Sequence, residues 1–246
     1  MKTCLFIPDC HIPFVDVRAY SIMLSIATDL APQEVVILGD YLDFYNVSNH
    51  PKDSKIRVSL EEELCQGREH LAELRGLFPQ SKITFIEGNH EYRLYRYLQS
   101  NAPQLSSFVD FADLIGLKGL GIDFVPYGPH QGYQPFNSFL TARHEPQSGG
   151  DNCASASLKK AFGSVIFGHT HRLQEAHGVG IDGREHTAIS SGWLGNKNQP
   201  VFNFCKSHHQ WQQGFTVGHF INGKWFLQTV KIKNGVGVLG GHYYEA

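Results

Sequence analysis

Four short groups of polar side chains suited to metal binding lie between Asp9 and His171. They read Asp9-Cys10-His11, Gly39-Asp40-Tyr41-Leu42-Asp43, Gly88-Asn89-His90-Glu91 and Gly168-His169-Thr170-His171. Imidazole nitrogens together with carboxylate and amide oxygens bind Mn, Fe, Zn or Ni, and histidine also transfers protons near neutral pH. The 246 residues include 14 histidines, well above the usual share of this residue. The groups therefore predict metal-assisted chemistry with a histidine available for proton transfer.

Each group directly follows a short run of β-branched or aromatic residues, which predicts a buried strand. The expected strands cover residues 3–7, 35–38, 83–87 and 164–167. Residues 17–30 have helical apolar spacing behind Asp16 as N-cap, and residues 60–77 follow a capping box formed by Ser59 and Glu62. Strands that alternate with helices predict a mainly parallel sheet, with the ligand site at the carboxyl ends of its strands. All four groups are then expected to meet there.

The second half of the chain is richer in strands. These are expected at residues 139–142, 187–190, 215–221 and 225–232, and further helices at 93–100, 105–114 and 154–162. Asn222-Gly223 between the last two strands predicts a type I′ hairpin turn. No repeat, low-complexity segment or obvious linker interrupts the chain, so we expect a single domain over residues 1–246. The pattern indicates two packed sheets with helices outside them.

Each polar group also has an ordinary explanation when taken alone. Asp9 and His11 fit a turn acid and a surface histidine, and Asp40 and Asp43 fit caps of the next segment. An isolated His-x-His is more often incidental, and a glycine before each group fits any turn that ends a strand. Four such groups, each at a strand end, favour one shared site over four coincidences.

The motifs Asp-x-His, Gly-Asp-x-x-Asp, Gly-Asn-His-Glu and Gly-His-x-His, in this order, resemble those of the calcineurin-like metallophosphoesterase family. The resemblance extends from Asp9 to His171, about two thirds of the chain. It implies an α/β fold, a four-layer α/β/β/α sandwich of two mixed sheets with outer helices. It also implies a dinuclear metal centre that hydrolyses phosphate mono- or diesters.

The resemblance carries over to individual residues. It implies that one metal is bound by Asp9, His11 and His171, the other by Asn89 and His169, and that Asp40 bridges the two. His90 resembles the family's histidine at the scissile phosphate, held by Asp43. The remaining ligand is a histidine about 25 residues before Gly-His-x-His, where His144 stands. Because Glu145 follows it in place of the family's glycine, His130 remains an alternative.

Two divalent ions bridged by a carboxylate can hold a hydroxide that attacks phosphorus in line. The donor set suits Mn, which we expect first, with Fe, Zn and Ni as alternatives. The ions leave the pocket cationic, which favours a phosphate anion. We expect His90 to protonate the leaving oxygen, with Asp43 orienting it and favouring the imidazolium, an effect of about 10²–10⁴-fold on rate.

Substrate-binding side chains are expected at three positions. Arg93 can reach a phosphate oxygen, and Tyr127 and His130 lie in an aromatic, turn-rich loop that could contact a nucleotide. The alternatives are that the loop packs against its own scaffold and that Arg93 belongs to a solvated helix face. His208, His209 and Trp211 form a second aromatic candidate.

A phosphatase or phosphodiesterase acting on a small ester or nucleotide is the leading expectation. A nuclease of the same family is the first alternative, but a net charge of -2 and the lack of a Lys/Arg-rich run show no extended nucleic-acid track. A phosphoprotein phosphatase and a non-catalytic interaction module are further alternatives.

Composition limits the class of protein and its expected location. A hydrophobic content of 41% with little net charge excludes intrinsic disorder, and no apolar run approaches the roughly 18 residues that cross a bilayer. The five cysteines are odd in number and scattered, which favours free thiols in a reducing compartment. We therefore expect a cytoplasmic protein without a membrane partner.

Overall fold

The computed structural model describes residues 1–246, which form two mixed sheets. The larger sheet has eight strands in the order β12-β11-β10-β9-β1-β2-β3-β4. Their bounds are β1 Lys2–Ile7, β2 Glu34–Ile37, β3 Lys82–Ile86, β4 Ile122–Val125, β9 Gly214–Ile221, β10 Lys224–Lys233, β11 Val236–Leu239 and β12 His242–Glu245. β1 to β4 are parallel, and β9 runs antiparallel to β1 and to β10.

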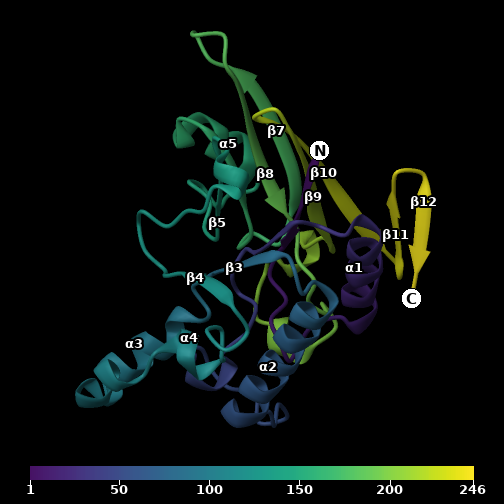
Figure 1. Cartoon of the computed structure of the whole chain (residues 1–246). Helices are drawn as coiled ribbons and strands as arrows, with labels where there is room; N and C mark the ends of the chain where they lie inside the picture. The colour runs from purple at the N-terminus through teal and green to yellow at the C-terminus, as the bar shows by residue number, and fades with distance from the viewer.

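The smaller sheet has four strands in the order β5-β6-β8-β7. Their bounds are β5 Leu140–Arg143, β6 Ser164–Phe167, β7 Leu173–Val179 and β8 Glu185–Ser191. β5, β6 and β8 are parallel, whereas β7 pairs antiparallel with β8, and these two strands form the long ribbon that projects in Figure 1.

The α-helices are α1 Val17–Leu30, α2 Leu60–Leu77, α3 Tyr92–Asn101, α4 Phe111–Leu114 and α5 Cys153–Ala161. The sequence predicted the bounds of α1 and α2, and both caps are confirmed. Asp16 accepts from the main-chain N–H groups of Arg18 and Ala19, and Ser59 forms a reciprocal capping box with Glu62.

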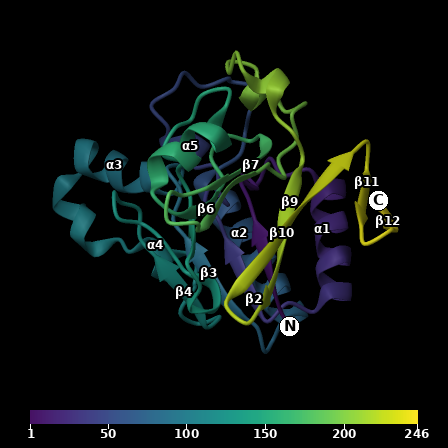
Figure 2. The ribbon, with the colours of Figure 1, turned by 90° about the horizontal axis from the view of Figure 1, so that it is seen from above.

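Three apolar layers separate the helices and sheets and so produce the predicted α/β/β/α sandwich. Strand alternation sends Leu5 and Ile7 of β1 toward the core under α1 and α2, and sends Cys4 and Phe6 toward the smaller sheet. A third cluster, which includes Cys153, packs α5 against the outer face of the smaller sheet. Figure 2 shows α1 and α5 on opposite sides of the molecule. The expected fold class is confirmed.

Two parts of the chain differ from the sequence expectation. The helix predicted over residues 105–114 is wrong, because a short 3-10 helix at Pro103–Phe108 ends at Val109 and Asp110 caps the separate helix α4. Strands β4, β7, β11 and β12 were not predicted, and three of them carry exposed side chains on one face. The Asn222-Gly223 turn is confirmed, with positive φ at both residues.

None of the helices is both long enough and apolar enough to span a bilayer.

Candidate metal centre

The four polar groups lie together because parallel strands end at the same edge of each sheet. Asp9 follows β1, Asp40 follows β2 and Asn89 follows β3 in the larger sheet. In the smaller sheet His144 follows β5 and His169 follows β6. The packing of the two sheets therefore brings donors from five strand ends into one place.

One donor group combines Asp9, His11, Asp40 and His171, whose potential ligand atoms all lie within 4.8 Å of one another. All four residues are buried. Nε2 of His11 lies 3.0 Å from Nε2 of His171, and Asp9 Oδ1 lies 3.5 Å from the same His171 nitrogen. Two imidazole nitrogens and a carboxylate oxygen that face one another form a donor set that a divalent cation fits.

A second donor group combines Asp40, His144 and His169 within the same 4.8 Å limit. Asn89 Oδ1 lies 2.9 Å from Nε2 of His144 and 2.8 Å from Nδ1 of His169, so it belongs to this group. Nε2 of His144 is also 3.3 Å from Asp40 Oδ1. Asp40 is thus common to both groups, which is the position of a bridging carboxylate.

The ring orientations of two histidines are set by acceptors behind them. Nδ1 of His144 donates to the Leu38 carbonyl at 2.8 Å, and Nδ1 of His11 donates to Asp43 Oδ2 at 2.9 Å. Because Nδ1 donates in both rings, Nε2 is the nitrogen that faces the donor cluster. Such acceptors behind a ligand histidine are the usual support of a metal site.

Main-chain N–H groups hold the two central carboxylates. The amide of His169 donates to both oxygens of Asp9 at 2.8 and 3.0 Å, and the amide of His90 donates to Asp40 Oδ1 at 2.8 Å. A Cβ atom on Gly168 would lie 2.4 Å from Asp9 Oδ2, and one on Gly88 would lie 2.2 Å from Asp40 Oδ1. The carboxylates therefore approach Gly168 and Gly88 too closely for a side chain at either position.

The backbone is strained at the same place. His11, Asp40, His169 and His171 all have positive φ, between 47° and 64°. The left-handed region is unfavourable for residues with a Cβ, and such strain gathers at functional sites.

The charges in the cluster suit cations. Although burial acts in the opposite direction, the Asp40 and Asp9 carboxylates raise the pKa of His144 to about 10. Burial lowers the pKa of His171 to about 4, so its ring is neutral and able to bind a metal near pH 7. Burial alone would raise the pKa of Asp40, but the neighbouring His144 and His90 hold it well below its usual value.

Asp43 lies in the cluster, but its contacts differ from the expectation. Its carboxylate accepts from His11, while Nδ1 of His90 donates to its main-chain carbonyl at 2.8 Å and lies 3.4 Å from its carboxylate. Burial, His11 and Arg93 together lower the pKa of His90 despite the opposing charges of Asp40 and Asp43. Asp43 thus positions His90, and its charge favours the imidazolium, but burial, His11 and Arg93 outweigh that effect.

Arg93 contacts the site rather than solvent. Its Nη2 donates to Nε2 of His90 at 2.7 Å, and its Nη1 donates to the Asp43 carbonyl at 2.9 Å. The side chain is 12% exposed. Arg93 therefore lies beside the histidine that is expected to donate the proton.

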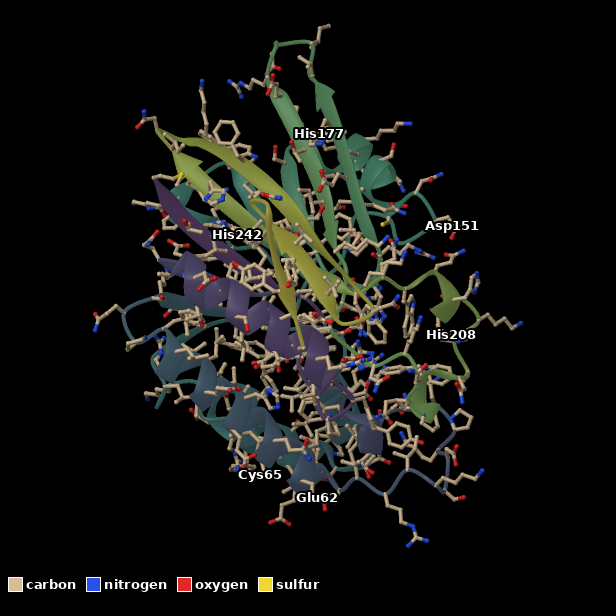
Figure 3. All side chains as sticks on the ribbon, turned by 90° about the vertical axis from the view of Figure 1, so that its right-hand side faces the viewer. Glu62, Cys65, Asp151, His177, His208 and His242 are labelled. Atoms are coloured by element: carbon tan, nitrogen blue, oxygen red, sulfur yellow. The ribbon has the colours of Figure 1, made fainter.

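Tyr127 and His130 do not reach the donor cluster. The Tyr127 hydroxyl donates to Glu145 at 2.5 Å and its ring stacks on Tyr92 at 4.8 Å, whereas His130 is exposed. Glu145, the departure from the family pattern, thus bonds to this loop, and His144 rather than His130 lies among the donors. Two other histidines lie on different elements: Figure 3 places His177 on the β7–β8 ribbon and His242 on the C-terminal hairpin.

Glu91 is a further positioning residue, for which the sequence predicts no role of its own. Its buried carboxylate accepts from the main-chain N–H groups of Asp40, Leu42 and Gly88 at 2.8–3.0 Å. It therefore joins the loop after β2 to the loop after β3. Its place directly after Asn89-His90 was the available sequence clue.

Aromatic rings cover the first donor group. Trp193 stacks on His171 with centroids 4.9 Å apart, and Trp211 meets the same ring edge-on at 4.2 Å. Phe202 packs against His11 at 5.7 Å. The sequence raised Trp211 as an aromatic candidate, but Trp193 stands in no motif and only the folded chain identifies it.

Comparison with known proteins supports the motif reading. A sequence model described as calcineurin-like phosphoesterase matches residues 2–173, a span that contains every proposed ligand. The Gene 54 protein of Mycobacterium phage L5 is 30% identical over 229 residues, which cover 88% of each chain. The Gene 54 protein of Mycobacterium phage D29 is 29% identical over 257 residues, which cover 99% of each.

Solved structures with a similar arrangement are more distant in sequence. Vps29 from Chaetomium thermophilum has a TM-score of 0.46 and 10% identity, over 95% of this chain and 87% of that one. The Pseudomonas putida nuclease MPE has a TM-score of 0.38 and 14% identity, over 92% of this chain and 87% of that one.

Proposed function

Because this chain belongs to the calcineurin-like phosphoesterase family and is a hydrolase of phosphate ester bonds, we propose that it cleaves phosphate mono- or diesters at a two-metal centre built on Asp40. The position of Asp40 is the main support for this proposal, because its carboxylate belongs to both groups of converging donors. A carboxylate shared in this way is what a bridged pair of ions requires.

The remaining donors divide between the two positions. Asp9, His11 and His171 would hold one ion, and Asn89, His144 and His169 would hold the other. Two divalent ions bound there would supply positive charge for the phosphate oxygens and a nucleophilic water at neutral pH. Manganese is the ion we propose, because the donors are nitrogen and hard oxygen atoms without a thiolate.

His90 is the proposed proton donor to the leaving oxygen, and the atom involved is Nε2. Nδ1 is already committed to the Asp43 carbonyl, so only Nε2 can exchange a proton with substrate. In the free protein Nε2 accepts from Arg93 at 2.7 Å. We infer that the incoming phosphate draws the guanidinium away from Nε2, which leaves that nitrogen free to take up a proton from water and pass it to the leaving oxygen.

The test measures hydrolysis of para-nitrophenyl phosphate and of bis-para-nitrophenyl phosphate, with Mn²⁺ and with EDTA. Wild-type protein should hydrolyse at least one ester only with Mn²⁺. On phenyl phosphate, whose leaving oxygen needs a proton far more than para-nitrophenolate does, His90→Ala should keep its bound metal and lose about 10²–10⁴-fold in rate. The control is Asp113→Asn, an exposed carboxylate outside the cluster, which should behave as wild type. Equal rates with Mn²⁺ and EDTA, or near-native turnover of phenyl phosphate by metal-loaded His90→Ala, would contradict the proposal.

A further inference from the structure

A cavity of about 320 Å³ adjoins the metal centre through Trp193. Trp193, which is buried and stacks on His171, is among the residues that line this cavity. The rest of its wall comes from the start of α1 and from segments 197–198, 211–213 and 231–235. Trp193 therefore contacts both the cavity and a ligand of the first proposed metal position.

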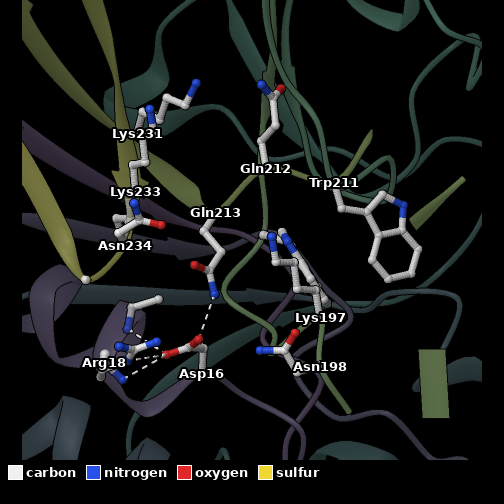
Figure 4. A pocket seen from close by; sticks show the side chains of 14 residues that line it. Asp16, Arg18, Lys197, Asn198, Trp211, Gln212, Gln213, Lys231, Lys233 and Asn234 are labelled. Atoms are coloured by element: carbon white, nitrogen blue, oxygen red, sulfur yellow. Dashed lines mark hydrogen bonds and ion pairs between the residues drawn. The ribbon is translucent and has the colours of Figure 1, made fainter. Parts of the chain in front are cut away.

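The cavity wall is strongly cationic. It includes Arg18, Lys197, Lys231 and Lys233 but only one acidic residue, Asp16. The Asp16 carboxylate is already in use, because it caps α1 through Oδ1 and accepts from Gln213 through Oδ2 at 3.0 Å, as Figure 4 shows. The three lysines are exposed and form no ion pair. The positive charge is thus available to an external anion.

Sheet topology places these cations at the reactive edge. β10 is antiparallel to β9, which is antiparallel to β1, so β10 and β1 run in the same direction. Lys231 and Lys233 lie at the end of β10 and on the same face of it, because the buried Ile232 stands between them. This end of β10 is at the sheet edge where Asp9 follows β1. Two strand spacings separate β10 from β1, which is about 10 Å. The cations therefore lie beside the metal centre at the same edge of the sheet, two strands away from Asp9.

We propose that this cavity binds backbone phosphates of a single-stranded nucleic acid whose reacting phosphodiester lies at the metal centre, an inference that rests on the proposed function. A nucleic-acid strand carries regularly spaced anions, so it can occupy the metal centre and this cavity at once. The half-buried Trp211 lines the cavity beside the lysines and offers an aromatic surface to an unstacked base. A duplex keeps its bases stacked inside and presents none to such a ring.

The test measures binding of fluorescein-labelled dT12 by fluorescence anisotropy, using the full chain in EDTA so that no cleavage occurs. The cavity variant is Lys197→Gln/Lys231→Gln/Lys233→Gln. The control is Lys118→Gln/Lys159→Gln/Lys160→Gln, three exposed lysines outside the cavity, so both variants change the net charge equally. Equal thermal unfolding midpoints would show that both variants fold.

The cavity variant should bind at least about tenfold more weakly than wild type, while the control binds within about twofold. The slope of log K against log salt should fall in magnitude by about 2, the amount expected when three contacts with single-strand phosphates are lost. A parallel titration with labelled U12 compares RNA with DNA. Lysine-dependent binding of either strand supports the site. The proposal would be overturned if both variants lost equal affinity for dT12, or if the cavity variant lost none. It would also be overturned if a 12-base-pair duplex bound as tightly and with the same dependence on the lysines.

Hydrolysis of bis-para-nitrophenyl phosphate by wild-type protein, measured in parallel, separates the two proposals. Metal-dependent hydrolysis without lysine-dependent strand binding overturns this inference and leaves the proposed function standing. Lysine-dependent binding without hydrolysis of any ester or strand overturns the proposed function and supports a strand-binding site alone.

Discussion

The Asp43 carboxylate accepts a hydrogen bond from Nδ1 of His11 at 2.9 Å, and both side chains are almost fully buried. Burial alone would raise the pKa of Asp43, but the adjacent His90 and His11 rings hold it below its usual range. The bond fixes which His11 nitrogen faces the donor cluster. Asp43 therefore acts on metal binding through His11 as well as on the proposed proton donor through its carbonyl.

Asp43→Ala should weaken Mn²⁺ binding about 10–100-fold, because loss of the acceptor behind a ligand histidine frees its ring to rotate. Asp43→Asn should lose less, since its amide oxygen can still accept from Nδ1. Isothermal titration with Mn²⁺ measures both. Unchanged affinity in Asp43→Ala would contradict this role.

His144→Ala should bind one fewer Mn²⁺ ion per chain than wild type, whereas His130→Ala should match wild type. His144 lies among the donors and His130 is exposed, so the pair is a matched test of one residue type. Metal content after gel filtration decides between them. The assignment fails if His130→Ala loses the ion and His144→Ala keeps it.

Gly168→Ala should lower kcat/KM by about 10²-fold, the penalty for moving a reacting group by about 1 Å. The added methyl would lie 2.4 Å from Asp9 Oδ2 and must displace that carboxylate. Gly149→Ala is the control, because a Cβ there meets nothing within 4 Å. Equal steady-state rates for the two variants would show that Asp9 tolerates the displacement.

Glu63 should make folding stability pH-dependent. Its buried side chain accepts from the Phe44 amide through Oε1, while Oε2 has no partner. Burial, reinforced by the Asp43 charge, raises the pKa of Glu63 from 4.5 to about 8. Between these values the folded protein keeps a proton that the unfolded chain has lost, so stability falls as pH rises through this window and levels off above it.

Glu63→Gln keeps a neutral acceptor at this position and has no proton to lose, so its stability should not fall through this pH window. Urea unfolding should find it close to wild type at pH 5 and more stable by on the order of 3 kcal/mol at pH 9. Glu61→Gln, an exposed position on the same helix, is the control. A constant stability difference between Glu63→Gln and wild type across this range would refute the titration of Glu63.

The ligand groups could be predicted from sequence because each depends on a local pattern. A short apolar run predicts a strand, and a parallel sheet brings the residue after each run to one edge, as Asp9 and Asp40 show. Helices α1 and α2 were likewise predictable, since their caps and apolar stripes are local. Family resemblance added roles that spacing alone does not assign.

Features that depend on distant pairing could not be predicted. Trp193 covers His171 only because its segment pairs beside Gln213. Lys231 and Lys233 end β10, whereas Lys197 lies in the loop after β8, and only the folded chain brings all three to one cavity. The absence of a basic run was therefore a poor guide to local charge.

Electron paramagnetic resonance of the Mn²⁺-loaded protein tests the central claim most directly, because it reports whether two ions share a bridge. We expect two Mn²⁺ ions per chain and a spin-coupled spectrum in wild type, with the coupling lost in Asp40→Asn. A single uncoupled Mn²⁺ signal in saturated wild-type protein, unchanged by Asp40→Asn, would contradict a two-metal centre built on Asp40.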